Sequence, residues 1–269
     1  MDVEKLTEMS EITEKNGICL HMSFFFCTFA RFLCECMKIA IIGYGKMGHM
    51  IEDIALSRGH EIVGIIDPTL AVSHQPSAIS FDSEEFRSAE VAIEFTTPST
   101  AETNIRKAWE QGVPVVCGST GWKPEELKSE KLKVKGEKNR VIIKDEQERT
   151  MLVWSSNFSV GVNIFFEMNK WLANEMAKQP QYTPSITETH HIHKLDKPSG
   201  TAKTLAEAIS HQLSAVSVPI ESIREGEVPG THEVKWDSEE DTIVITHIAK
   251  GRRGFALGAV LAAEEMVRL

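Results

Sequence analysis

The glycine turn at residues 43–48 restricts the fold of this chain more than any other segment. An apolar run, Lys38–Ile42, leads into it, and a helical pattern follows it to about Ser57. The turn itself consists of Gly43, Tyr44, Gly45, Lys46, Met47 and Gly48. In such a strand–turn–helix the first glycine permits a tight turn, the second lets a pyrophosphate approach the backbone, and the third lets the helix pack on the strand. The segment therefore predicts the first unit of a Rossmann-like, dinucleotide-binding domain.

An acidic residue stands where such a domain would bind the adenosine ribose. The second apolar run, Glu61–Ile66, ends at Asp67, and Pro68 follows it. A carboxylate at this spacing bonds the ribose hydroxyls, whereas a 2′-phosphate would meet negative charge without a basic partner. The sequence thus predicts NADH as the preferred cofactor over NADPH, unless a distant Lys or Arg compensates.

The alternation of strand and helix continues, which predicts a parallel sheet with crossover helices. Strands are expected at Val91–Phe95 and Val113–Cys117, with a helix at Thr100–Gln111 between them. The turn Gly118-Ser119-Thr120-Gly121 then lies at the carboxyl end of a strand, where open α/β sheets bind ligands.

The charged stretch at residues 124–150 predicts little buried structure. We expect a solvated helix, a short strand near Val141–Ile143, and a loop. An apolar strand, Met151–Trp154, follows this stretch.

After residue 158 the pattern changes to α+β. Helices are expected at Val160–Lys178, from Thr201 to about Leu213, and at Gly254–Val267. Strands are expected at Thr183–His190, Ser217–Arg224, His232–Trp236 and Asp241–His247. They predict a mostly antiparallel or mixed sheet. The expected division is an extension at 1–36, a dinucleotide-binding domain at 37–157, and a substrate and oligomerisation domain at 158–247, with the helix at 248–269 packing back on the first domain.

The first 36 residues are expected to lie outside the fold, because Met37 opens the first apolar strand. Four of the five cysteines lie here, at Cys19, Cys27, Cys34 and Cys36. Their spacings match neither a disulfide framework nor paired zinc knuckles. The apolar segment is interrupted by Arg31, lacks a cleavage signature and is too short to span a bilayer.

The overall charge excludes one class of partner. A formal net charge of -10 is unsuited to a broad nucleic-acid-binding surface. An anionic ligand must therefore be bound by a local basic pocket.

Residues 188–201 supply such a pocket, since they combine three histidines, two lysines and a Ser-Gly-Thr helix start. Imidazoles exchange protons near neutral pH, and ammonium groups and helix N-termini bind carboxylates. A zinc site is the alternative, with a further ligand from Glu188, His232 or His247. Because adjacent residues on a strand face opposite sides, His190 and His191 are expected to be separated, which favours acid–base and anion-binding roles over a metal.

The chain from Met37 to its end resembles the 4-hydroxy-tetrahydrodipicolinate reductase family of bacterial lysine and diaminopimelate biosynthesis. The most specific motif is His-His-x-His-Lys-x-Asp-x-Pro-Ser-Gly-Thr, complete at residues 190–201. The turns at 43–48, 118–121 and 155–163 support it. The residues before Met37 have no family counterpart, and the charged stretch is longer than usual.

The resemblance implies a role for each matching residue. His190 would donate and accept the proton, and Lys194 would be a second proton donor. The substrate, a small cyclic dicarboxylate, would be bound by His191, Gly200 and Thr201. The nicotinamide cofactor would be held by the glycine turn and by Asp67, Gly118, Ser119, Thr120, Ser155, Ser156, Asn157 and Phe158. Family members are typically cytoplasmic homotetramers.

Two other functions stay open on the sequence. An aspartate-dehydrogenase-like enzyme would share the first half of the chain but oxidise an amine. A catalytically idle NADH-sensing protein would bind the nucleotide and regulate a partner.

Overall fold

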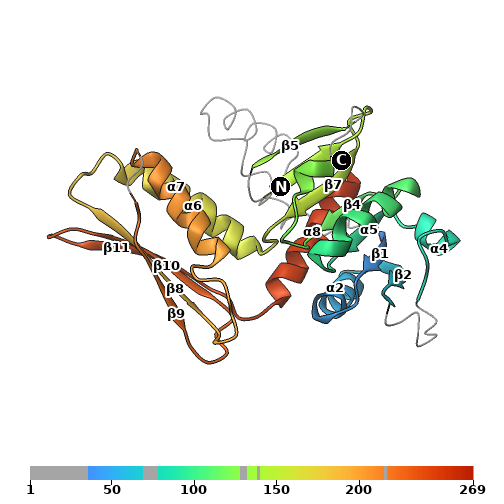
Figure 1. The fold of residues 1–269 in the computed structure, drawn as a ribbon, viewed down its shortest axis with the longest axis horizontal. Helices are drawn as coiled ribbons and strands as arrows, with labels where there is room; N and C mark the ends of the chain where they lie inside the picture. Colours follow the sequence, from blue (N-terminus) through green and yellow to red (C-terminus); the bar gives the residue numbers. More distant parts are fainter. Residues whose placement is uncertain (1–35, 69–77, 128–131, 138–139, 215–216, 269) are drawn as a thin grey trace, which may run out of the picture. The chain divides into compact units, whose positions relative to one another are not determined.

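Two β-sheets organise the part of the chain that the structure describes (Figure 1). The structure is a computed structural model, and it describes residues 36–68, 78–127, 132–137, 140–214 and 217–268. By their contacts, Met37–Leu269 form one unit and Met1–Cys36 another. The extension expected at residues 1–36 lies, except for Cys36, outside the described residues.

The larger sheet has seven strands in the order β2-β1-β3-β4-β7-β6-β5. Its strands are β1 (Lys38–Ile42), β2 (Glu61–Ile66), β3 (Val91–Glu94), β4 (Val115–Cys117), β5 (Lys133–Glu137), β6 (Arg140–Lys144) and β7 (Thr150–Ser155). The first five in this order run parallel, and β6 and β5 add an antiparallel edge. Its connections contain α2 (Lys46–Ser57), α4 (Glu84–Arg87), α5 (Pro98–Glu110) and the 3₁₀ helix η3 (Pro124–Leu127).

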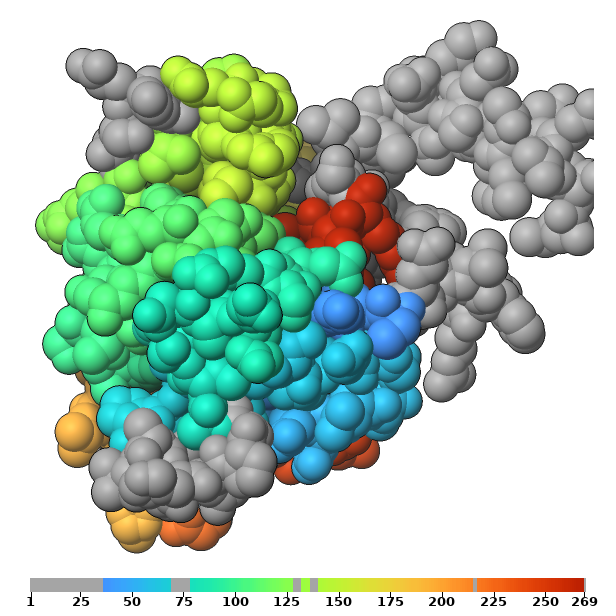
Figure 2. All heavy atoms as spheres, turned by 90° about the vertical axis from the view of Figure 1, so that its right-hand side faces the viewer, coloured from blue at the N-terminus to red at the C-terminus, as the bar shows by residue number. Residues whose placement is uncertain are grey.

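Strand β1 is apolar on both faces because helices cover both. Ile39 and Ile41 belong to a core with residues of α2 and α8 (Arg253–Arg268), whereas Ala40 and Ile42 belong to a second core with residues of α5. A parallel sheet covered on both sides needs such continuous apolar strands. Figure 2 shows residues of α2 (blue) beside those of α4 and α5 (teal to green) on one face of the molecule.

The smaller sheet has four strands in the order β11-β10-β8-β9. They are β8 (Thr183–His190), β9 (Ile220–Arg224), β10 (Thr231–Asp237) and β11 (Thr242–Ile248). The β8–β9 pair is parallel and the others are antiparallel, so the expected mixed sheet is confirmed. One face is covered by α6 (Val160–Met176) and α7 (Gly200–Gln212), as Figure 1 shows. No helix in the described ranges is both long and apolar enough to cross a membrane.

The solvated helix expected in the charged stretch is wrong for the residues described there. A 3₁₀ turn, η3, is followed by the antiparallel pair β5 and β6. The short strand expected near Val141–Ile143 is confirmed as β6, where both residues alternate with less buried ones and contribute to the core on the α5 side. This period of two is that of a strand with one buried face.

The C-terminal helix α8 packs on the larger sheet through small residues. Ala256, Ala259 and Ala263 are fully buried there, and Gly258 lies against the backbone of Phe158. A Cβ atom at Gly258 would lie 1.6 Å from the Phe158 carbonyl oxygen. The opposite end of α8 is held by Glu264, which accepts hydrogen bonds from Arg58 at 2.5 and 2.9 Å.

We therefore expect Gly258→Ala to lower the free energy of unfolding by about 3 kcal/mol, because a backbone carbonyl cannot rotate out of the way. Urea denaturation would measure the change. Gly254→Ala is the matched control on the same helix, since the nearest atom to its Cβ would be the Ser159 Oγ at 3.8 Å. The control should be neutral or stabilising by up to about 1 kcal/mol, as alanine is the better helix former. Equal stability of the two variants would contradict the packing described here.

Candidate active site

The turns expected to bind the cofactor lie along one edge of the larger sheet. They follow the carboxyl ends of β1, β2, β4 and β7, which together with β3 form the parallel run β2-β1-β3-β4-β7. Parallel strands deliver all their carboxyl ends to the same edge, which is where open α/β sheets bind ligands. The edge thus brings the glycine turn, Asp67, Gly118–Thr120 and Ser155–Asn157 to one side of the sheet.

The glycine turn has room for a pyrophosphate. Gly43 has a φ of 91°, and a Cβ there would lie 2.3 Å from the Phe95 carbonyl oxygen. A Cβ at Gly48 would lie 2.3 Å from the Gly43 oxygen, whereas nothing lies within 4 Å of one at Gly45. Gly45 is also the N-cap residue of α2 and, because it has no side chain, makes no capping hydrogen bond. The turn is closed on its protein side and open where phosphates would approach the helix N-terminus, so these residues fit a dinucleotide.

Asp67 is already oriented toward the glycine turn. Its Oδ2 accepts a hydrogen bond from the Tyr44 backbone N–H at 2.7 Å. The Tyr44 hydroxyl donates to Glu52, and burial together with this bond raises the pKa of Tyr44 to about 12. Tyr44 is therefore a neutral phenol that links the turn to α2.

The turn after β4 is partly structural. The Ser119 hydroxyl accepts from the Thr96 backbone N–H at 2.8 Å, and its carbonyl accepts from Trp122 and Trp154, each at 2.8 Å. A Cβ at Gly118 would lie 2.1 Å from the Phe95 ring. Ser119 and Gly118 thus shape the turn, and Thr120 is the residue that reaches the cavity described below.

The turn after β7 also contains both residues that shape the turn and residues that line the cavity. Ser155 Oγ donates to the Asn157 carbonyl at 2.9 Å, which fixes the turn. Ser156 and Asn157 line the cavity, but Phe158 is buried in the core shared with α8. The side chain of Phe158 therefore belongs to the core and does not line this cavity.

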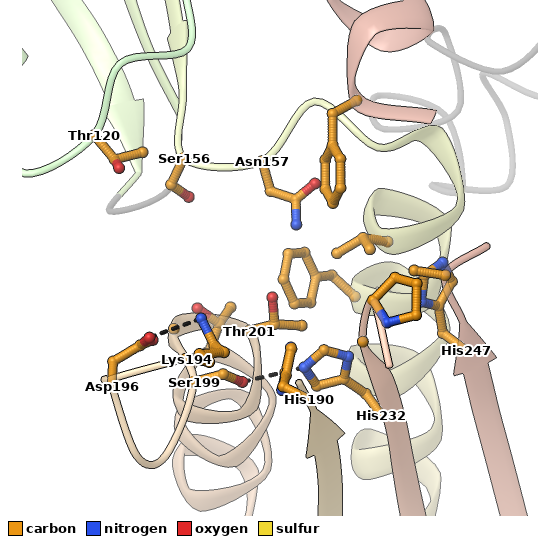
Figure 3. Close-up of a pocket in the computed structure, with 18 of the residues that line it drawn as sticks. Thr120, Ser156, Asn157, His190, Lys194, Asp196, Ser199, Thr201, His232 and His247 are labelled. Carbon is orange, nitrogen blue, oxygen red and sulfur yellow. Dashed lines mark hydrogen bonds and ion pairs between the residues drawn. The ribbon is translucent and has the colours of Figure 1, made fainter. Parts of the chain in front are cut away.

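A cavity of about 450 Å³ joins this edge to the histidine run (Figure 3). On the nucleotide side it is lined by Thr120, Ser156 and Asn157. On the other side it is lined by His190, His191, Lys194, Asp196, Ser199, Gly200, Thr201, His232 and His247, among others. The structure therefore brings together every residue for which a substrate or proton-transfer role was expected.

His190 and His191 were expected to face opposite sides of the sheet, but the structure places both at the cavity. Strand β8 ends at His190 and the chain then turns, so the alternation of a strand no longer applies to His191. Both residues line the cavity. His193 lies outside it, exposed and 3.2 Å from the Glu227 carboxylate.

His190 is held by a fully buried carboxylate. Its Nδ1 donates to Glu188 Oε2, and Arg224 Nη2 donates to Glu188 Oε1 at 2.9 Å. Burial lowers the pKa of His190, although the Glu188 charge opposes the shift. Burial also disfavours the Glu188 anion, but hydrogen bonds from Arg224 and His190 outweigh it, so the pKa of Glu188 lies below its ordinary value.

His232 stands beside His190 with its ring centroid 5.0 Å away. It is 4% exposed, and its Nε2 lies 3.1 Å from the Ser199 hydroxyl, which caps α7. Burial, reinforced by the neighbouring His190, lowers the pKa of His232 to about 4. His232 is therefore neutral at physiological pH.

The groups of the cavity that are suited to an anion lie at the start of α7. Gly200 and Thr201 form the first turn of the helix, whose N-terminus favours negative charge. Lys194 reaches this region and forms an ion pair with Asp196, with Nζ and Oδ1 2.7 Å apart. A dicarboxylate has one ammonium and one helix N-terminus available to it.

Glu188, His190 and His232 are also the described residues that come nearest to a metal-binding arrangement, with candidate ligand atoms within 4.8 Å of one another. Both oxygens of Glu188 already accept hydrogen bonds from protein donors. A metal would have to displace Arg224 or His190, so the geometry favours a hydrogen-bonded cluster.

Arg224 is the residue of this cluster to which sequence reasoning gave no role. It considered Ser199 only as a helix start, and Glu188 and His232 only as zinc ligands. Glu188 carried a usable signal, because it lies two residues before His190 and so on the same face of β8. Arg224 carried none, since its partner Glu188 is 36 residues away in the chain.

A nucleotide-binding sheet edge that opens on a cavity with acid–base and anion-binding groups defines a dinucleotide-dependent oxidoreductase. Two family models match the chain: "Dihydrodipicolinate reductase, N-terminus" over residues 37–158 and "Dihydrodipicolinate reductase, C-terminus" over residues 161–268. The chain belongs to the dihydrodipicolinate reductase family.

Curated relatives agree with this assignment. A 4-hydroxy-tetrahydrodipicolinate reductase of Christiangramia forsetii is 42% identical over 239 residues, which cover 85% of this chain and 91% of that protein. One of Staphylococcus aureus is 33% identical over 249 residues, covering 86% and 95%. These relatives favour neither an aspartate-dehydrogenase-like enzyme nor an NADH sensor.

A solved structure supports the fold. The dipicolinate-bound dihydrodipicolinate reductase from Paenisporosarcina sp. TG-14 superposes with a TM-score of 0.66 at 20% identity, covering 87% of this chain and 96% of that one.

The low pKa of His232 predicts a pH-dependent stability. The unfolded imidazole takes up a proton below about pH 6.5, whereas the folded one does so only near pH 4. Stability contributed by the neutral ring is complete above pH 6.5 and is lost as the pH falls to 4. The loss amounts to about 3 kcal/mol at 1.36 kcal/mol per pKa unit.

As the pH falls from 6.5 to 4, the free energy of unfolding of the wild type should decrease by about 3 kcal/mol more than that of His232→Phe. Urea denaturation at several pH values would measure it. His193→Phe, at an exposed position, is the control and should follow the wild-type curve. Parallel curves for His232→Phe and the wild type would show that His232 is not buried in its neutral form.

Proposed function

We propose that this protein reduces 4-hydroxy-tetrahydrodipicolinate to tetrahydrodipicolinate with NAD(P)H and loss of water, as a step of lysine and diaminopimelate biosynthesis. The observation that carries the proposal is the single cavity that joins Thr120, Ser156 and Asn157 to His190, Lys194 and Thr201. Membership of the dihydrodipicolinate reductase family supports the choice of substrate.

The residues of the cavity divide the chemistry between them. The hydroxyl group of the substrate leaves as water together with a hydrogen of the adjacent carbon, and a bound dihydronicotinamide would supply a hydride to the unsaturated carbon that results. Lys194 and the α7 N-terminus, with Gly200 and Thr201, bind the substrate carboxylates. His190 supplies the proton that the ring gains as electron density moves toward its nitrogen, and Lys194 is a second proton donor. His191 lies beside the carboxylate site and binds substrate.

We propose NADH as the preferred cofactor. The support is Asp67, whose carboxylate lies at the glycine turn and is followed by Pro68, with no basic residue adjacent to receive a 2′-phosphate.

We further propose a homotetramer working in the cytoplasm, as the family resemblance implies. The tetramer is supported by apolar residues exposed on the four-stranded sheet, namely Ile223, Val244 and Ile248. Analytical ultracentrifugation would measure the assembly.

The activity is tested by following the loss of dihydronicotinamide absorbance with substrate made in situ from pyruvate and aspartate semialdehyde by a dihydrodipicolinate synthase. We expect oxidation that depends on the synthase product, with a higher kcat/KM for NADH than for NADPH. Oxidation without the synthase would indicate another substrate. A preference for NADPH would contradict the role of Asp67, and cofactor binding without any turnover would favour a sensor.

His190→Gln is expected to lower kcat by about 10²–10⁴-fold, because the reaction loses its positioned acid. NADH affinity should be unchanged, since His190 lies on the substrate side of the cavity. Steady-state kinetics and NADH titration would measure the two effects. His193→Gln is the matched control within the same histidine run, and its turnover should be normal. Near-normal turnover of His190→Gln would remove His190 from the mechanism.

A further inference from the structure

We propose that Glu188 is a positioning residue for proton transfer, and that its ion pair with Arg224 ties the proton-donating histidine to both parts of the carboxylate-binding site. The proposal rests on the proposed function and goes beyond it, because it concerns residues that do not themselves contact the substrate.

Glu188 determines the tautomer of His190. Glu188 is 0% exposed and stands on the same face of β8, two residues before His190. Its ionised carboxylate can only accept, so the hydrogen bond from His190 places a proton on Nδ1. Nε2 is then the nitrogen left for the substrate, and a carboxylate behind Nδ1 stabilises the imidazolium form that donates from Nε2.

The other oxygen of the same carboxylate bonds the start of α7 and Arg224. Glu188 Oε1 accepts from Arg224 Nη2 at 2.9 Å and from the Ser199 backbone N–H at 3.3 Å. Ser199 is the N-cap of α7, so the carboxylate also fixes the helix start where Gly200 and Thr201 lie.

Arg224 connects Glu188 to the segment that carries Lys194. Besides Glu188, its guanidinium donates to the backbone carbonyls of Lys194, at 3.3 Å, and of Asp196, at 2.6 Å. The segment that carries the Lys194 ammonium is therefore held by the partner of Glu188. One ion pair sets the relative positions of the proton donor, the ammonium and the helix N-terminus.

The charges around His190 make Glu188 the source of its proton affinity. Arg224 on β9 and Lys194 in the following turn both disfavour a second positive charge, and the rings of His232 on β10 and His247 on β11 are nearby on the same side of the sheet. Glu188 is the group whose charge favours the imidazolium. Removing that charge should therefore shift proton donation to lower pH.

A purely structural role is the alternative, in which Glu188 and Arg224 only join β8 to β9. Such a role would change stability or KM but would move neither the pH profile of kcat nor the position of the His190 proton. These two readouts distinguish the alternatives.

The experiment uses the full chain and compares the wild type with Glu188→Gln. We expect the descending limb of kcat against pH to move about one unit lower, which is about tenfold less protonated imidazole at a given pH above the limb. NADH affinity should not change. Glu221→Gln, an exposed carboxylate on β9, is the matched control and should keep the wild-type profile. An unshifted profile for Glu188→Gln at reduced kcat would overturn the proposal.

Histidine ¹⁵N NMR of the wild type keeps the test independent of folding of the variant and of the identity of the substrate. We expect neutral His190 to carry its proton on Nδ1, and a proton on Nε2 would overturn the proposal. Arg224→Lys should raise the KM for substrate about tenfold or more, since a lysine cannot bond the carboxylate and both carbonyls together. An unchanged KM would remove Arg224 from the arrangement.

The proposed function and this proposal fail in different ways. If the wild type does not turn over the synthase product, the proposed function is lost, while the His190 tautomer still decides the role of Glu188. If the wild type is active and its His190 proton lies on Nε2, the function stands and Glu188 is structural.

Discussion

The antiparallel register of β8 and β10 is the constraint on which the site depends. On the face covered by α6 and α7, Ile186 lies opposite Val234 and Glu188 lies opposite His232. Ile186 and Val234 therefore belong to the apolar core. Two residues further along each strand, Glu188 and His232 belong to the site. Because side chains alternate, a slip of one residue would move Glu188 and His190 to the outer face of the sheet. The apolar core that fixes the register also fixes the chemistry.

Much of the fold could be predicted because its signals are local. The strand–turn–helix at residues 38–57 needs only its glycines and its apolar run, and β8 was predicted with its observed bounds from one alternating segment. The helix α6 begins at Val160, where its amphipathic pattern predicted it. Strand β6 was predicted near Val141–Ile143, but its antiparallel partner β5 was missed because charged residues dominate the β5 sequence.

The candidate site could be predicted only in its contiguous part. The motif at residues 190–201 marks His190, Lys194 and Thr201, and all of them line one cavity. The groups behind them come from other strands: Arg224 bonds Glu188 across 36 residues of sequence, and His232 lies 33 residues from Ser199. No pattern within one segment records such a contact, since it arises when the sheet forms. Sequence reasoning therefore identifies the groups that meet a ligand more readily than those that orient them.

The two ion pairs of the site differ in how readily an incoming carboxylate can replace the acidic partner. Lys194 and Asp196 are partly exposed, with side chains 24% and 52% accessible, and such pairs contribute only about 0–1 kcal/mol. An incoming carboxylate can take the place of Asp196 at little cost. Glu188 and Arg224 are 0% and 14% accessible, and removing one partner of a buried pair costs about 3–5 kcal/mol. In the proposed mechanism Lys194 is thus the cation that binds substrate, whereas Arg224 stays paired with Glu188 and holds His190 in place.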